Sequence, residues 1–504
     1  MKASFERRRI IALAALVCVA AGSAAGLTTG LVSCTPVEKQ VEARPLSATE
    51  AQRLAGMRAR NFEDARVGIR ATLGKPGADI KLAGWVDWRR PLVYLAATAP
   101  TPGPDDGLLQ AVPGVIATRP GRADGGLPPE TPPAKEWRVR PSTATAAQPA
   151  PIDSFVALLF AIAAEKPDHA DLLARSDSRW LGTDRIADLP VDVLLGPALP
   201  PQPKPTATPT AKPPAPTATA SASAQPVGPA SPTPGPNSLA AMGGAVRYWL
   251  DGDARLHRFE ALLGKDLPVK VDLTREKRPE LVAIDAFGGR TTKPRQVNDA
   301  EAEALALMRQ RNRAAGGGQI TLTVPMLPAG TMLANGWLDW RQTVAYIGAY
   351  DMDKTDERVL MRANRTGVTV RNDGFEAGKL PPLPPTSGDW QTIPWSARGD
   401  ELGGLDLDLL LNEALAVSGT GRDDVDALKQ VALWLRKDTL AGGPVNVFEI
   451  AKGADVGGAR GAARIRYWMD RTGVVRRLEL RTRMGAFAQL DITPGDVPTL
   501  SRPR

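Results

Sequence analysis

Side chains able to do covalent or metal chemistry are scarce in this sequence. It contains two His, His169 and His257, and two Cys, Cys18 and Cys34, both near the N-terminus. A catalytic Cys and a Cys/His zinc site are therefore excluded from the body of the chain. The sequence also lacks a Gly-x-Ser-x-Gly nucleophile elbow, a His-Glu-x-x-His zinc motif and the Lys-Ser/Thr pair of a phosphate-binding loop. We expect no enzyme activity, no cofactor and no metal site.

The acidic positions that recur along the chain have a structural explanation. Asp87 and Asp339 stand at one kind of predicted hairpin turn, and Asp251 and Asp470 stand at another. Asp in such turns accepts hydrogen bonds from backbone N–H groups. We therefore expect these carboxylates to stabilise turns and to take no part in acid–base chemistry.

Cys34 is the one candidate for a covalent modification. Residues Ile10–Ser33 carry no charge, and three Arg directly precede them. The positive-inside rule then places the N-terminus in the cytoplasm and everything after Cys34 on the extracytoplasmic side. Leu31–Cys34 matches a bacterial lipobox, which predicts lipid attachment at Cys34 after cleavage. The apolar stretch is also long enough to be an uncleaved transmembrane anchor, and both interpretations stay open.

The body of the chain is a duplication. Gly84–Arg89, with the sequence GWVDWR, returns as Gly336–Arg341, with the sequence GWLDWR. Ten of the eleven Trp fall into five equivalent pairs, and chance does not hold so many rare residues in one register. The pairs are Trp85/Trp337, Trp88/Trp340, Trp137/Trp390, Trp180/Trp434 and Trp249/Trp468.

The spacing of these pairs defines the domain organisation. We predict an anchor segment over residues 1–34, a first repeat over 45–290 and a second repeat over 295–500, called repeat one and repeat two below. The last Trp pair is separated by 219 residues and the one before it by 254, so repeat one carries an insertion. A Pro-rich, low-complexity stretch at 200–237 accounts for it and is expected in a surface loop.

Hydrophobic periodicity gives both repeats the same elements. Each opens with a helix behind a capping box, Ser47–Glu50 in repeat one and Asn298–Glu301 in repeat two. An internal apolar helix follows at 153–164 or 406–417, and strands and hairpins fill the rest. The fold class is α+β: two tandem copies of a curved antiparallel β-sheet, or half-barrel, packed against helices.

Two further patterns give local expectations. The Gly316–Gly318 run indicates a loop or a turn. Arg residues gather on the last strands of repeat two, among them Arg464, Arg466, Arg476 and Arg477. We expect them on a solvated sheet face, with anionic lipid headgroups or wall polymers as the alternative counter-charge. The formal net charge of +8 is not taken as a sign of nucleic-acid binding, because the body of the chain is expected outside the cytoplasm.

The order of elements resembles that of the LolA/LppX–LprG group of lipoprotein carriers and lipid-binding lipoproteins. Tyr248–Asp251 followed by Arg258–Glu260, and Tyr467–Asp470 followed by Arg477–Glu479, carry the resemblance. The Gly-Trp-x-Asp-Trp hairpins support it. The resemblance implies a half-barrel sheet wrapped over helices, with an apolar cavity that holds acyl chains. The duplication and the Pro-rich insertion depart from the pattern of the group.

The expected function follows from the location and this resemblance. We expect a protein anchored to the cell membrane by its N-terminus that binds a lipid-like or apolar ligand without catalysis. The alternative is a non-enzymatic module for cell-envelope interaction or assembly, with envelope proteins as partners and cores filled by side chains. A cavity between internal helix and sheet favours the first function, and a solid core favours the second. The paired Trp fit a packed core or an aromatic-lined pocket, and no single ligand-binding residue is predicted.

Overall fold

The computed structural model describes most of both repeats. The described residues are 42–101, 106–121, 126–146, 148–198, 245–264, 266–326, 330–372, 375–385, 389–395, 406–452 and 459–500. The predicted anchor at 1–34, with Cys34, lies outside these ranges, and so does the whole of the predicted insertion at 200–237, which falls within 199–244. Among the helices of the described ranges, none is long and apolar enough to cross a membrane.

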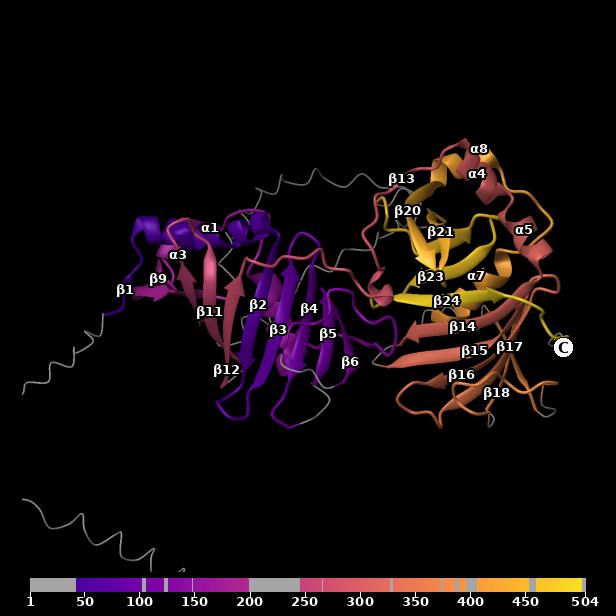
Figure 1. Ribbon diagram of the computed structural model, residues 1–504, viewed down its shortest axis with the longest axis horizontal. Helices are drawn as coiled ribbons and strands as arrows, with labels where there is room; N and C mark the ends of the chain where they lie inside the picture. Colours follow the sequence, from indigo (N-terminus) through magenta and orange to yellow (C-terminus); the bar gives the residue numbers. More distant parts are fainter. Residues whose placement is uncertain are drawn as a thin grey trace, which may run out of the picture. The chain divides into compact units, whose positions relative to one another are not determined.

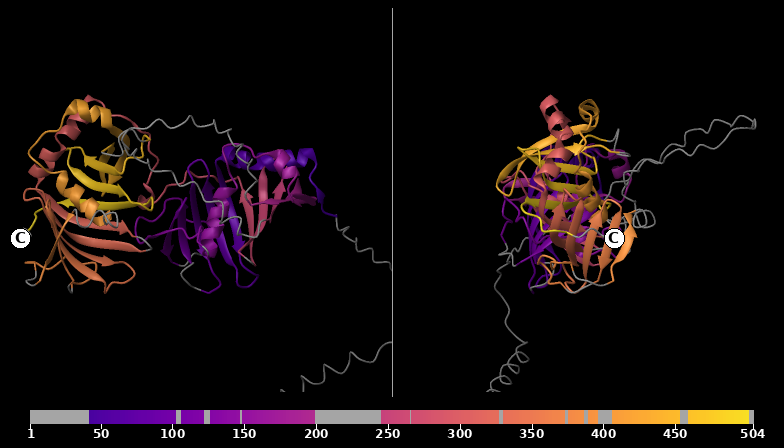
Figure 2. Two further views of the ribbon diagram at one scale, coloured as in Figure 1. Left: turned by 180° about the vertical axis from the view of Figure 1, so that it is seen from behind. Right: turned by 90° about the vertical axis from the view of Figure 1, so that its right-hand side faces the viewer.

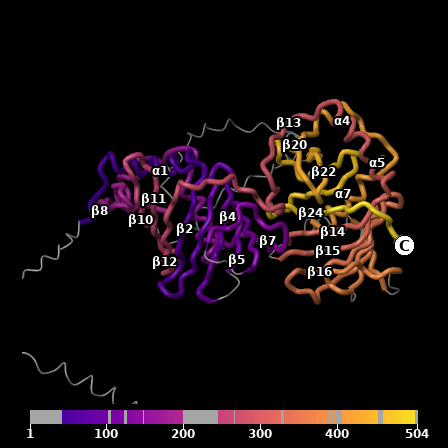
Figure 3. The backbone as a smooth tube through the Cα atoms, viewed as in Figure 1, coloured from indigo at the N-terminus to yellow at the C-terminus, as the bar shows by residue number. Residues whose placement is uncertain are grey.

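Repeat one is built on a 12-stranded antiparallel sheet. The strand order is β1-β8-β9-β10-β11-β12-β2-β3-β4-β5-β6-β7, which can be followed from β8 to β7 in Figure 3. The strands are β1 (Arg44–Pro45), β2 (Arg66–Leu73), β3 (Ile80–Asp87), β4 (Leu92–Thr98), β5 (Gly107–Val112), β6 (Val115–Pro120), β7 (Arg138–Pro141), β8 (Arg179–Ile186), β9 (Leu189–Pro197), β10 (Ala245–Leu250), β11 (Leu256–Leu263) and β12 (Leu267–Thr274). The helices are α1 (Ala48–Asp64), α2 (Pro151–Ala161) and α3 (Ala170–Ala174).

Repeat two has a second 12-stranded sheet with the same strand order, position by position. Its strands are β13 (Arg295–Gln296), β14 (Gly317–Pro325), β15 (Thr331–Asp339), β16 (Val344–Asp351), β17 (Arg358–Asn364), β18 (Gly367–Arg371), β19 (Gln391–Pro394), β20 (Ala432–Leu440), β21 (Gly443–Ile450), β22 (Ile465–Asp470), β23 (Val475–Arg481) and β24 (Phe487–Pro494). Its helices are α4 (Asp299–Ala306), α5 (Met308–Ala315), α7 (Asp406–Ala416) and α8 (Val425–Val431). A short 3-10 helix, η1 (Asp285–Phe287), precedes it. The chain therefore contains two tandem copies of one antiparallel α+β unit.

The capping boxes explain where each repeat begins. Ser47 Oγ accepts a hydrogen bond from Glu50 N, and the Glu50 carboxylate accepts one from Ser47 N at 2.8 Å. Asn298 and Glu301 make the same two bonds at 2.9 Å each. These side chains satisfy N–H groups that have no partner within a helix, so the predicted helix starts are confirmed.

The internal helix distinguishes the two faces of each sheet. We call the face that carries α2 or α7 the inner face and the opposite one the outer face. Figure 1 shows α7 within the curve of the second sheet, and Figure 2 shows the same sheet from behind and from the side. A Trp of the repeated motif holds the C-terminal half of each helix: Trp88 Nε1 donates to Leu159 O at 2.8 Å, and Trp340 Nε1 donates to Ala414 O at 3.0 Å.

The prediction for Gly316–Gly318 was wrong for two of the three residues. Gly316 ends α5 in the left-handed region, with a φ of 86°, but Gly317 and Gly318 begin strand β14. A Cβ atom at Gly317 would lie 1.9 Å from Leu338 O, and one at Gly318 would lie 2.1 Å from Thr493 O. The glycines allow close approach of β14 to the strands on both sides, and a Gly run does not distinguish this role from a turn.

Candidate functional site

The recurrent Asp residues lie at hairpin turns, as predicted. Asp251 Oδ1 accepts hydrogen bonds from two backbone N–H groups of its turn, at 2.9 Å each. Asp87, Asp339 and Asp470 bond to turn backbone in the same way. His257 Nε2 lies 2.9 Å from Asp251 Oδ2. The described ranges contain no group of three or more His, Cys, Asp or Glu side chains placed to hold a metal ion.

The inner face of repeat one is filled by side chains. Phe155, Leu158 and Leu159 of α2 are all exposed by 1% or less and belong to one apolar cluster with the inner side of the sheet. A gap of about 160 Å³ remains near the start of α2, beside Ile152. Pockets that bind small ligands are typically about 300 Å³ or larger. The described part of repeat one therefore matches the solid core of the alternative function.

The inner side of repeat two has an open groove beside α7. Its volume is about 500 Å³. It is lined by Met308, Arg309, Arg365, Asn412, Glu413, Ala416, Val417, Asp423, Leu428, Ile450 and Lys452. Apolar side chains from α5, α7, α8 and the end of β21 form part of this lining, and charged side chains lie among them. Such a combination can take up a molecule that is apolar at one end and polar at the other.

Charged side chains around the groove are partly paired. Lys452 Nζ lies 2.7 Å from Glu413 Oε1, and the same oxygen accepts a hydrogen bond from the Tyr467 hydroxyl at 2.7 Å. Arg309 and Asp423 are 3.5 Å apart. Burial, and then the Glu413 carboxylate, raise the pKa of Tyr467 well above its usual range, so the hydroxyl remains a donor at neutral pH.

The two repeats differ most clearly at the position of Glu413. Asn61 Nδ2 donates to Ile162 O at 2.7 Å, and Asn312 Nδ2 donates to Val417 O at 2.8 Å. These bonds, together with those of the two Trp, align α2 with α7 so that Leu158 occupies the place of Glu413. Repeat one therefore has a buried leucine where repeat two has a carboxylate that lines a groove.

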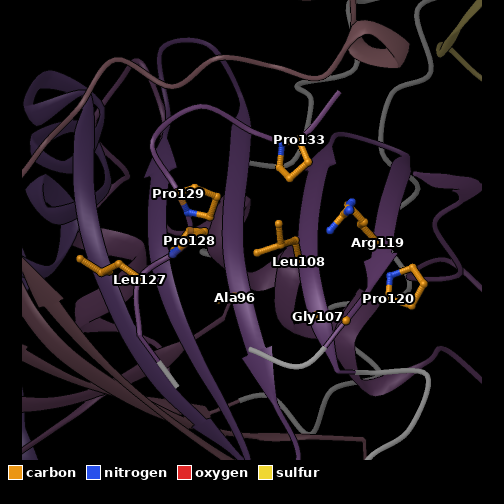
Figure 4. Close-up of a pocket in the computed structure, with 10 residues that line it drawn as sticks. Ala96, Gly107, Leu108, Arg119, Pro120, Leu127, Pro128, Pro129 and Pro133 are labelled. Carbon is orange, nitrogen blue, oxygen red and sulfur yellow. The ribbon is translucent and has the colours of Figure 1, made fainter. Parts of the chain in front are cut away.

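A second pocket lies on the outer face of repeat one. It has a volume of about 500 Å³, and the side chains that surround it are shown in Figure 4. It is lined by Ala96, Gly107, Leu108, Arg119, Pro120, Gly121, Leu127, Pro128, Pro129 and Pro133. Leu127 also lines a neighbouring pocket of about 280 Å³ that reaches Trp85. The resemblance to lipid-binding lipoproteins gave no expectation of pockets on this face.

The prediction of a solvated Arg-rich face in repeat two was wrong for Arg466 and Arg477, whereas the side chains of Arg464 and Arg476 are 41% and 30% exposed. Arg466 and Arg477 are exposed by only 5% and 7%, and Arg436 is exposed by 6%. The segment that joins the repeats covers them, because Gly288 O accepts hydrogen bonds from Arg436 Nη1 at 3.1 Å and from Arg466 Nη1 at 3.4 Å. The alternation of residues along a strand predicts the face on which a side chain lies. It does not predict whether another segment of the chain covers that face.

The covered charges form one network around Arg477. Its guanidinium bonds to Asp285 Oδ2 at 2.7 Å and to Asp491 Oδ2 at 3.0 Å, and it lies 4.0 Å from Glu479. Burial raises the pKa of Glu479, and Arg466 and Arg477 offset part of that effect. Charges buried in this way are costly to leave unpaired, so we interpret the network as the attachment of the joining segment to the sheet.

No groove or pocket residue was assigned a ligand-binding role from the sequence. The groove has one signal in the sequence, the exchange of Leu158 for Glu413 on the internal helix, but it becomes visible only when the two helices are aligned by their contacts. The outer-face pocket has another, because Leu127–Pro129 recurs as Leu380–Pro382. A recurrence of this kind indicates duplication and does not by itself indicate a site.

The comparisons with known proteins give weak likenesses. No protein-family model and no curated protein matches the sequence. In structure the chain is similar to the lipoprotein LppX of Mycobacterium tuberculosis, with 13% identity, a TM-score of 0.22, and coverage of 39% of this chain and 97% of LppX. It is also similar to an outer membrane lipoprotein-sorting protein domain of Vibrio parahaemolyticus, with 12% identity, a TM-score of 0.18, and coverage of 39% and 92%. A third likeness is to MucB, solved in complex with MucA, with 10% identity, a TM-score of 0.17, and coverage of 62% and 86%. Likenesses at this level assign neither a family nor a ligand.

Proposed function

We propose that this chain is a non-catalytic, extracytoplasmic protein that binds a lipid-like ligand in the groove beside α7 of repeat two. The N-terminal segment would anchor it to the cell membrane, through a lipid on Cys34 or as an uncleaved helix. The groove is the single observation that carries the proposal. It combines an apolar lining with charged side chains between the internal helix α7, the helices α5 and α8 and the end of β21, and its volume of about 500 Å³ is that of a ligand site.

The chemistry of the groove favours an amphipathic ligand. Met308, Val417, Leu428 and Ile450 are each exposed by less than 9%, so an acyl chain against them would be removed from water. Arg309, Arg365 and Lys452 would lie near a polar or anionic headgroup. Repeat one, with its filled inner face, would contribute no such site.

Native mass spectrometry and solvent extraction test the proposal on residues 43–504, purified from the extracytoplasmic fraction of a bacterial host. These residues form one compact unit that contains both apolar cores. We expect one lipid equivalent per chain, from repeat two alone. Ala416→Trp should abolish this adduct, because Ala416 is exposed and lines the groove.

The matched control is Ala300→Trp, at an exposed alanine of α4 that does not line the groove. It should retain the lipid. A chain that carries no lipid and takes up none from offered phospholipid would contradict the proposal and leave the envelope-interaction function. Two equivalents, or an adduct that survives Ala416→Trp, would place the lipid elsewhere.

A further inference from the structure

Part of the charge in the groove of repeat two belongs to the scaffold that both repeats share. Arg309 and Asp423 lie 3.5 Å apart, and their counterparts in repeat one, Arg58 and Asp168, pair at 2.9 Å. Each Asp also donates its backbone N–H to a carbonyl of the first helix of its repeat. Because this pair also occurs in the repeat whose inner face is filled, the fold explains it without a ligand.

Two further charged side chains of the groove occur in repeat two alone and pair with each other. Glu413 stands in place of Leu158, as described above. The register of β21 and of β9 against their neighbouring strands places Lys452 where repeat one has Ala198. Lys452 Nζ and Glu413 Oε1 lie 2.7 Å apart, so the two charges balance. This pair makes the groove polar without giving it a net charge.

Arg365 is the cation of the groove lining that has no carboxylate partner among the described residues. It lies in the two-residue turn between β17 and β18, and the equivalent turn of repeat one, between β5 and β6, has Pro113 in its place. Its Nη2 donates to Ser418 O, just beyond the end of α7. A guanidinium has five N–H donors, and Arg365 is exposed, so further donors can reach a molecule in the groove.

The lining as a whole holds three cations and two carboxylates, which leaves one positive charge, that of Arg365. The volume of about 500 Å³ lies in the lower half of the range for ligand pockets and suits one acyl chain better than two. Resting on the function proposed above, we propose that the groove binds an amphiphile with one acyl chain and one negative charge. Its carboxylate or phosphodiester group accepts hydrogen bonds from Arg365, and its chain lies against Val417, Leu428 and Ile450.

Two pairs of probes with the same lauroyl chain isolate the charge: lysophosphatidylglycerol against lysophosphatidylcholine, and laurate against monolauroylglycerol. Their dissociation constants are measured on residues 43–504 by isothermal titration calorimetry, below the concentrations at which they form micelles. We expect the anionic probe to bind about tenfold more tightly than its neutral or zwitterionic partner, and the pair with the larger ratio identifies the acid. Arg365→Gln should remove this preference and leave the affinity for the partner probe unchanged, and Arg365→Lys should retain part of it.

The matched control is Arg313→Gln, which removes the same charge from repeat two. Arg313 also donates to a backbone carbonyl, Arg341 O at 2.7 Å, but it does not line the groove. This variant should keep the preference for the anionic probes. A preference lost equally in both Gln variants would be an effect of overall charge and would overturn the assignment to Arg365.

The remaining outcomes separate this proposal from the groove itself. Equal binding of all probes, abolished by Ala416→Trp, would overturn the anionic ligand and leave the groove as a lipid site. A preference that survives Arg365→Gln would do the same, as would a two-chain lipid recovered by extraction. A protein that binds none of the probes and carries no lipid adduct would overturn both proposals.

Discussion

The two repeats share a scaffold but differ in how their outer faces are covered. In repeat two, Arg477 is buried under the joining segment and pairs with Asp285 and Asp491. In repeat one, the equivalent Arg258 pairs with Asp272 on a partly exposed surface. After the duplication, the contacts between the internal helix and the sheet were conserved in both repeats, whereas the surfaces around them changed. Identical strand order therefore does not mean identical function.

The largest loss of stability is expected on substitution of Arg477. Arg477→Met should lower the free energy of unfolding by about 3–5 kcal/mol, because it leaves buried acids without their cation. Arg258→Met in repeat one should cost less than about 1 kcal/mol, since that pair is partly exposed. Urea unfolding followed by tryptophan fluorescence measures both. Equal losses would contradict the view that the joining segment buries the network of repeat two.

The second-largest loss of stability is expected at Asn61 and Asn312. In each repeat this side chain joins the first helix to the C-terminal end of the internal helix by a hydrogen bond. Asn312 donates to Val417 O and accepts from Val475 N at 2.9 Å, whereas the Asn61 oxygen has no partner among the described residues. Asn312→Ala should cost about 3 kcal/mol and Asn61→Ala about 1–2 kcal/mol. Chemical denaturation of the two variants gives the comparison. A larger loss at Asn61 would show that its oxygen has a partner after all.

The sequence predicted the scaffold well because the scaffold depends on local patterns. The capping boxes, the hairpin Asp residues and the Trp88/Trp340 pair are short signals, and each has the same kind of contact in both repeats. Strand existence followed from alternation, as at Ile320–Val324 within β14. These elements could be predicted because the residues that decide them lie within a few positions of one another.

The candidate sites could not be predicted because they depend on contacts between distant segments. The groove needs the placement of Lys452 next to Glu413, and the outer-face pocket needs Leu127 next to Leu108. The burial of Arg466 depends on a segment that precedes it by more than a hundred residues. Strand alternation places such an arginine on the outer face but does not reveal what covers that face.

A smaller effect on stability is expected from Glu50 and Glu301, which make the same contacts at the start of the first helix in the two repeats. Hydrogen bonds from Arg44, opposed by burial and aided by Ser47, lower the pKa of Glu50 from 4.5 to about 2. In repeat two, burial raises the pKa of Glu301, but hydrogen bonds from Arg295 and Asn298 outweigh it, and the net shift is again downward. A lowered pKa in the folded state stabilises the fold above pH 4.5, and this contribution is lost as the pH falls from 4.5 to about 2.

Titration of stability with acid measures this effect. Because Arg44 is 45% exposed, we expect a contribution of only about 1–2 kcal/mol from Glu50. Glu50→Gln should flatten the pH dependence of the unfolding free energy in that window, and Glu301→Gln should flatten it in the same direction. If only one of the two variants changed the pH dependence of the unfolding free energy in this window, the N-termini of the two first helices would not be equivalent. The similarity between the repeats would then not extend to the start of these helices.

The smallest change in stability is expected at Tyr94 and Tyr346, and its sign should differ between the two repeats. Tyr346→Phe removes the hydrogen bond to Pro382 O and leaves that carbonyl without its donor, so it should cost about 1 kcal/mol. Tyr94→Phe removes a buried hydroxyl that has no partner among the described residues, so the ligand-free protein should be unchanged or stabilised by up to about 1 kcal/mol. Thermal unfolding of both variants measures the two changes. A Tyr94→Phe variant that is destabilised would mean that the hydroxyl already has an acceptor, and the two outer faces would then differ in shape alone.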